Sequence, residues 1–134
     1  MRKLISLIAG GMMLASTPAL ASSPQGEEEL ERALAGRVAG EPVQCINMFQ
    51  SSSSRIIDRT AIIFRVGSTL YVNRPRVGAE SLDRSDALFS RRFGSASRLC
   101  NDETMRVIDP VSGIMNGIVF LGDFVPYRRA SSRY

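Results

Sequence analysis

Apolar positions over residues 55–74 are largely β-branched and aromatic, and they flank the dipeptide Gly67-Ser68. A two-residue loop with glycine first, between two such runs, predicts a β-hairpin with a type II′ turn. The loop also sets the register of the two strands. The predicted pairs are Val66 with Thr69, Arg65 with Leu70, Phe64 with Tyr71, and Ile63 with Val72. Both faces of this hairpin carry apolar side chains, so we expect it to be central and covered on at least one side.

The first 21 residues have the pattern of a cleaved export signal. A basic start, an apolar run over residues 4–14 and the tripeptide Ala-Leu-Ala at 19–21 match the three parts of a signal peptide. We predict cleavage between Ala21 and Ser22, which leaves a mature chain of 134 less 21, or 113, residues. An uncleaved anchor is the alternative, but the apolar run is short for a membrane span. The mature chain is then expected to be periplasmic or secreted, with no transmembrane segment.

The stretch 22–41 predicts a mobile start followed by an amphipathic helix from Glu27 to Val38. Its apolar residues at helical spacing are Leu30, Ala33, Leu34 and Val38. Acids precede the arginines along the helix, which is the order that the helix dipole favours, and Glu41-Pro42 is expected to end it. The acidic start of the helix has two interpretations, a docking tail or a solvated helix face.

The remaining chain predicts one β-rich domain over residues 42–126. Its further strands are expected at Val43–Phe49, Ala87–Phe93, Met105–Asp109 and Gly117–Leu121, the last continued by Phe124 and Val125. The pattern predicts a polar turn at Ser51–Ser54 and a flexible, arginine-rich tail at 127–134. We therefore predict a mainly β (α+β) fold, in which a small antiparallel sheet of five to seven short strands curls into a sandwich or barrel, with one N-terminal helix.

Two cysteines, Cys45 and Cys100, remain after the leader. In an oxidising compartment an even pair in a small chain is most simply a disulfide, which stabilises by about 4 kcal/mol in the chain-entropy model. The alternative is a reactive thiol. The mature chain, however, lacks the His or Lys that would lower the thiol pKa.

Composition excludes most enzyme classes. Without His the chain lacks the usual general base, the Ser-His and Cys-His arrangements and the commonest zinc ligand, and it has no glycine-rich phosphate loop. We expect no catalytic or metal-binding residues and no cofactor. Carboxylates are the remaining catalytic option, because two acids such as Asp58 and Asp109 at a suitable separation would hydrolyse a glycosidic bond. Turn formation is the competing interpretation for Asp102, and for Asp83 and Asp86, which are spaced unlike a calcium loop.

The mature chain has a weak positive charge, because the leader removes two of the 17 cations and leaves 15 against 13 acids. A charge this small does not indicate nucleic-acid binding. All the remaining cations are arginines, which bind carboxylates and phosphates through two hydrogen bonds at once. The candidate anion-binding residues are Arg91, Arg92, Arg128 and Arg129. The alternative is that these arginines are simply solvated, since neighbours in a strand point to opposite sides.

A short internal echo links residues 55–58, Arg-Ile-Ile-Asp, with residues 106–109, Arg-Val-Ile-Asp. Each copy follows a cysteine and precedes a strand-like run. A duplicated half-sheet and a chance match both account for the echo.

Several short segments match a pattern found in one group of proteins: Cys45-Ile46, Ile57-Asp58, Leu70-Tyr71-Val72-Asn73, Leu99-Cys100 with Asp102, and Val107-Ile108-Asp109. Through them the chain resembles small exported proteobacterial proteins of uncharacterised function, which have a signal peptide and two cysteines. The resemblance runs from Cys45 to Phe124. It implies a secreted β-rich domain with a disulfide, and it implies no activity and no site residues.

The sequence therefore predicts a non-enzymatic binding or structural component of the cell envelope. Its expected partner is an envelope protein or an anionic envelope component. Two alternatives are a small hydrolase with paired carboxylates and a periplasmic inhibitor of a cell-wall-degrading enzyme, the latter by analogy of build alone. Geometry separates these classes: a hydrolase needs two acids that converge in one pocket within about 5 to 10 Å, whereas a binder needs an exposed arginine or apolar patch.

Overall fold

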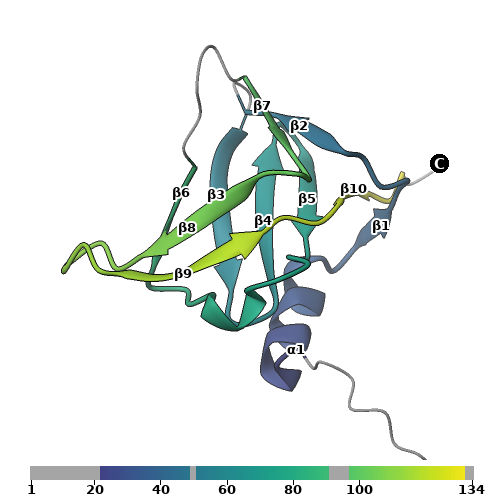
Figure 1. Ribbon diagram of the computed structural model, residues 1–134. Helices are drawn as coiled ribbons and strands as arrows, with labels where there is room; N and C mark the ends of the chain where they lie inside the picture. Colours follow the sequence, from purple (N-terminus) through teal and green to yellow (C-terminus); the bar gives the residue numbers. More distant parts are fainter. Residues whose placement is uncertain (1–21, 49–50, 91–96, 132–134) are drawn as a thin grey trace, which may run out of the picture.

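The computed structural model describes residues 22–48, 51–90 and 97–131 (Figure 1). The predicted signal peptide, the candidate residues Arg91 and Arg92, and the end of the tail at 132–134 lie outside the described residues. The described part is mainly β, with one α-helix and antiparallel sheets. These features confirm the predicted fold class at this level.

The largest sheet has five strands in the order β1-β10-β5-β4-β3. Its strands are β1 (Arg37–Ala39), β10 (Phe124–Arg129), β5 (Thr69–Asn73), β4 (Ala61–Val66) and β3 (Ser51–Ile57). The predicted hairpin is β4 and β5, and its register is confirmed, with Phe64 opposite Tyr71. Gly67 has a φ of +60°, which glycine adopts without steric cost and which the first position of the predicted turn requires.

Two smaller antiparallel sheets complete the fold. They contain β2 (Cys45–Asn47) with β7 (Arg98–Cys100), and β8 (Thr104–Ile108) between β6 (Ala87–Phe89) and β9 (Met115–Phe120). One 3₁₀ turn, η1 (Ala79–Ser81), precedes β6. The predicted barrel is wrong, because the sheets are separate and do not close. The predicted number of strands is also too low, because the described part forms ten short strands in these three sheets.

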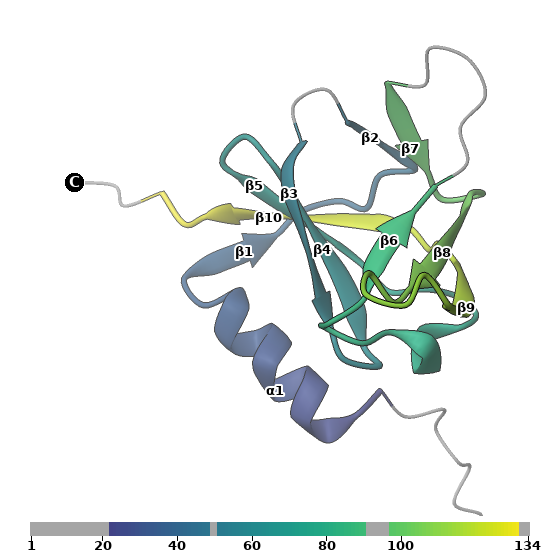
Figure 2. The same ribbon diagram turned by 90° about the vertical axis from the view of Figure 1, so that its left-hand side faces the viewer.

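The five-stranded sheet is buried on both faces, so the molecule has three layers (Figure 2). The first core lies between this sheet and the smaller sheets. It contains Ile46, Ile56, Ile62, Phe64, Leu82, Leu99, Met105, Val107, Val119, Leu121 and Phe124. The second core lies under the helix α1 (Pro24–Ala33) and contains Leu30, Ile57, Ala61, Ile63, Leu70 and Val72. The two apolar faces of the predicted hairpin are therefore both covered.

The helix α1 is shorter than the predicted helix and begins earlier. The Ser23 side chain accepts a hydrogen bond from the backbone N–H of Gly26 and caps the start, followed by Pro24 in the first turn. The helix ends at Ala33 because Gly36, with a φ of +75°, redirects the chain into β1. The predicted end at Val38 is wrong, since the pairing of β1 with β10 overrides the helical spacing of that residue.

The path after β9 also differs from the prediction. Phe124 and Val125 do not continue the β9 strand, because they begin β10 in the five-stranded sheet. Buried Asn73 secures this crossing: its amide donates to the Gly122 carbonyl oxygen at 2.7 Å and its oxygen accepts from the Gly122 N–H at 2.9 Å. The flexible tail predicted from Tyr127 is wrong as far as Arg129, because these residues pair with β1.

Ser51–Ser54 is the first half of β3 and not the predicted polar turn. Its pairing with β4 places Ser54 opposite Phe64. The strand lies at the edge of the sheet, where one side has no neighbouring strand and polar residues are tolerated. Tertiary pairing therefore overrides the turn preference of serine here.

Candidate functional site

The β6-β8-β9 sheet has one buried face and one exposed face. Met105, Val107 and Val119 are buried in the first core. Because side chains alternate along a strand, the residues between them lie on the opposite side of the sheet, which we call the outer face. The pairing of the strands arranges the outer face in three rows: Ala87, Ile108 and Met115; Phe89, Arg106 and Ile118; and Thr104, Phe120 and Val77.

The outer face is apolar except for Arg106 and Thr104. The exposed fractions of its large apolar residues are 58% for Val77, 54% for Phe89, 52% for Met115, 43% for Phe120 and 41% for Ile118. Single apolar side chains are common on protein surfaces, but a contiguous group of this kind marks an interaction site. This face is the strongest candidate for a functional surface in the described part of the chain.

Arg106 occupies the middle of the outer face, with Phe89 on one side and Ile118 on the other. The side chain is exposed, and it forms no ion pair with any residue that the structure describes. A guanidinium group forms strong, oriented hydrogen bonds with a carboxylate or phosphate. The outer face therefore presents one cation within an apolar surround.

The backbone beneath the outer face is held firmly. The Arg76 N–H donates to the Phe120 carbonyl oxygen at 2.8 Å, and the Phe120 N–H donates to the Val77 carbonyl oxygen at 2.9 Å. Gly78 packs so closely on β9 that a Cβ atom at this position would lie 2.1 Å from the Ile118 carbonyl oxygen. The side of β9 away from β8 is thus covered by residues 76–78, and the apolar side chains project from an ordered sheet.

The turn between β8 and β9 extends the apolar surface. The Asp109 carboxylate accepts hydrogen bonds from the N–H groups of Val111 at 2.8 Å and Ser112 at 3.2 Å, which lower the pKa of Asp109. Val111 and Ile114 in this turn are exposed, and the turn projects beyond the five-stranded sheet (Figure 1). Asp109 therefore shapes a turn.

The opposite outward face, under α1, is covered, and Arg55, Arg74 and Arg84 form ion pairs with acids there. Glu27 forms two hydrogen bonds with the Arg74 guanidinium, which lowers the pKa of Glu27 to about 2 and raises that of Arg74. Glu29 accepts a hydrogen bond from Arg55 at 2.8 Å and another from Arg84 at 3.4 Å. Glu27 and Glu29 therefore join the helix to the rest of the fold. Neither the docking tail nor the solvated helix face, the two interpretations of the acidic run, describes these two residues.

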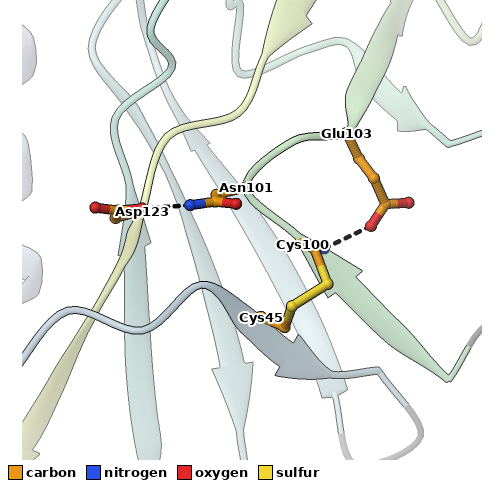
Figure 3. Close-up of a disulfide and its surroundings, with 5 residues drawn as sticks. All are labelled: Cys45, Cys100, Asn101, Glu103 and Asp123. Carbon is orange, nitrogen blue, oxygen red and sulfur yellow. Dashed lines mark hydrogen bonds between the residues drawn. A yellow bond between two sulfur atoms is a disulfide. The ribbon is translucent and has the colours of Figure 1, made fainter.

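Cys45 and Cys100 form the predicted disulfide and lie directly opposite each other in β2 and β7 (Figure 3). The alternative of a reactive thiol is therefore wrong. The Glu103 carboxylate accepts a hydrogen bond from the Cys100 N–H at 2.5 Å. Asp102 also lies near this sulfur, but a disulfide sulfur is no thiolate ligand, so the three residues do not form a metal site.

The two acids named as a catalytic pair, Asp58 and Asp109, are each engaged in separate hydrogen bonds. Asp58, in the β3–β4 turn, accepts hydrogen bonds from the Arg84 side chain, and the Asp109 carboxylate accepts hydrogen bonds within its own turn. Asp102 and Asp123 share a surface hollow of about 320 Å³ with Asn101 and two arginines. A general acid for glycosidic cleavage needs an apolar surround, which this hollow does not provide.

Two of the candidate anion-binding arginines, Arg128 and Arg129, lie in the described part of the chain. Arg128 and Arg129 are exposed and adjacent in β10, where neighbouring side chains point to opposite faces of the sheet. Their guanidinium groups therefore start from opposite faces of the sheet. Arg91 and Arg92 lie outside the described residues.

The outer face was not predicted from the sequence, although a signal for it exists. Ile118 to Leu121 is an unbroken apolar run. Such a run indicates a strand with apolar side chains on both faces. Only the structure shows that one of these faces has no cover from the described residues.

Comparison of the chain with protein-family models, curated proteins and solved structures found no match. Function is therefore inferred from the geometry of the chain itself. Within the described residues, no helix has the length and apolar character needed to cross a membrane.

Proposed function

We propose that the protein is a non-enzymatic binding protein of the cell envelope, periplasmic or secreted, that docks onto an envelope protein through its outer face. The observation that carries this proposal is the row of exposed Phe89, Arg106 and Ile118 with the neighbouring apolar side chains. A signal peptide cleaved between Ala21 and Ser22 is part of the proposal. The disulfide is consistent with an oxidising compartment.

Two of the candidate acids, Asp83 and Asp109, are poorly suited to act as the proton donor of a hydrolase. Among the described acids whose pKa clearly departs from its usual range, Glu27, Asp83 and Asp109 all have a lowered pKa. In each case hydrogen bonds stabilise the ionised form. A glycosidase needs one acid with a raised pKa as proton donor, so these groups do not supply it. An inhibitor of a cell-wall-degrading enzyme is one form of the proposed binding function.

The test is affinity purification from a detergent-solubilised envelope extract of the source organism, with the tagged mature chain at low and moderate salt. The double variant Ile118→Ser and Phe120→Ser removes apolar surface from the outer face. Val38→Ser is the matched control, since Val38 is 61% exposed on β1, in a different sheet. Retained proteins and lipids are identified by mass spectrometry.

We expect a stoichiometric protein that both the wild-type chain and Val38→Ser retain and that the double variant loses. Binding that persists in the double variant would refute docking through the outer face. Retention of anionic lipid alone, lost at moderate salt, would instead support the anionic envelope component as partner.

A further inference from the structure

The two copies of the sequence echo have equivalent places in two hairpins. Residues 55–58 end β3 and enter the turn to β4, and residues 106–109 end β8 and enter the turn to β9. In each copy the second residue, Ile56 or Val107, is buried in the first core. The arginine before it therefore points to the outward side of its sheet.

The two arginines differ in what faces them. Arg55 lies on the face that α1 covers, and its guanidinium donates to the Glu29 carboxylate at 2.8 Å. The next helix residue, Leu30, is buried against the same face. Arg106 lies on the outer face and has neither a described acid nor an apolar cover. On the covered face, the helix supplies both an apolar side chain, Leu30, and a carboxylate, Glu29. No described element supplies such a cover to the outer face.

We propose that the partner covers the outer face with an apolar protein segment that carries a carboxylate opposite Arg106. This inference rests on the binding function proposed above and names the chemistry of the partner. Apolar residues of the segment pack on Ile118 and Phe120, and the carboxylate accepts the guanidinium hydrogen bonds. Arg106 then determines specificity, because a segment with a cation or no charge at this point leaves the arginine desolvated and unpaired.

A second copy of this chain does not meet that requirement. In a two-fold dimer the same patch of each copy packs on itself, so the centre of the patch meets its own symmetry mate. The centre of the outer face is Arg106, and the surrounding members of the face contain no acid. Two guanidinium groups would then be buried together in an apolar interface. Charge complementarity therefore favours a different protein with an acidic residue in its apolar surface.

The test uses the full chain in the source organism, with Ile118 replaced by the photo-cross-linking residue p-benzoylphenylalanine. Cross-linking is compared in four backgrounds: no further change, Arg106→Gln, Arg106→Glu and Arg65→Glu. Arg65 is a matched control because it is exposed in β4, in a different sheet. Adducts are sized on denaturing gels, and the cross-linked peptides are sequenced by mass spectrometry.

We expect an adduct with a different protein, and a cross-linked peptide that contains Asp or Glu among apolar residues. Its yield should fall about tenfold with Arg106→Glu, less with Arg106→Gln, and not with Arg65→Glu. Changing the partner's carboxylate to Lys should restore the yield with Arg106→Glu.

An adduct of two copies of this chain would overturn the inference. So would an adduct that is insensitive to Arg106→Glu but lost with Phe120→Ser, although in that case the proposed binding function stands. The absence of any adduct, or an adduct unaffected by Phe120→Ser, would overturn both.

Discussion

The described part of this protein has two apolar sheet faces that point outward, and described residues cover only one of them. The face of the five-stranded sheet under α1 buries Ile63 and Val72 beneath Leu30. On the outer face of the β6-β8-β9 sheet, by contrast, Phe89 and Ile118 remain 54% and 41% exposed. The first arrangement stabilises the fold, whereas the second adds little to it because its apolar surface stays in water. This difference indicates that the outer face serves an intermolecular contact.

The largest effect is expected under the helix, with Leu30→Ala. Leu30 is 3% exposed, so its truncation leaves a cavity between α1 and the sheet. The free energy of unfolding should fall by about 2–4 kcal/mol, measured by urea denaturation of the oxidised mature chain. A loss below about 1 kcal/mol would show that the helix cover is not a stabilising element, and the contrast between the two faces would disappear.

The next effect is expected at Asn73, which connects the two sheets that carry these faces. Asn73→Leu removes both hydrogen bonds to Gly122 and leaves the buried backbone groups of that residue unpaired. We expect the free energy of unfolding to fall by about 2–3 kcal/mol. Asn116→Leu is the control, because Asn116 is exposed and its amide donates a hydrogen bond to the Asp86 side chain. Equal losses in urea denaturation would contradict the assigned role.

A smaller effect follows from the pH dependence of the helix cover. The folded pKa of Glu27, about 2, is below its usual 4.5, so the ionised form favours the folded state. This stabilisation is complete above pH 4.5 and is lost as the pH falls through about 2. The ion pair is partly exposed, so we expect it to contribute about 1 kcal/mol or less. Urea midpoints at pH 6 and pH 3 should therefore differ less for Glu27→Gln than for the wild type, and identical differences would contradict this role.

The smallest effect on stability is expected on the outer face, with Phe120→Ser. Its side chain is 43% exposed and lies outside the first core. The free energy of unfolding should change by less than about 1 kcal/mol. Binding of an apolar fluorescent dye to the folded protein should fall clearly. A loss as large as that of Leu30→Ala would show that the outer face is part of the folded core. Unchanged dye binding would show that it is not an accessible apolar surface.

Local patterns predicted the parts of the fold that depend on neighbours in the chain. The β4–β5 hairpin and its register followed from the Gly67-Ser68 loop and the β-branched and aromatic residues around it, and the disulfide followed from an even cysteine count. The end of α1, the strand at Ser51–Ser54 and the path of β10 were predicted wrongly. The end of α1 and the path of β10 are decided by pairing with strands distant in sequence, whereas Ser51–Ser54 pairs with the next strand, β4. In each case strand pairing overrides local preference.

The candidate site shows the same division. The run Ile118 to Leu121 is typical of a strand with apolar residues on both sides, but the exposure of one side depends on which other segments reach it. Residues 55–58 and 106–109 are nearly identical in sequence, yet the first arginine meets Glu29 and the second meets no described acid. That outcome was not visible in either tetrapeptide.

The sequence by itself determined the β-rich class, the central hairpin, the cysteine pair and the lack of histidine chemistry, because composition and short-range alternation decide these properties. Only the tertiary structure decided that α1 covers one apolar face and that no described residue covers the other, which has Arg106 at its centre. The physical reason is that burial is a property of the packed chain. An apolar residue has the same character in the sequence whether its neighbours in space cover it or leave it in water.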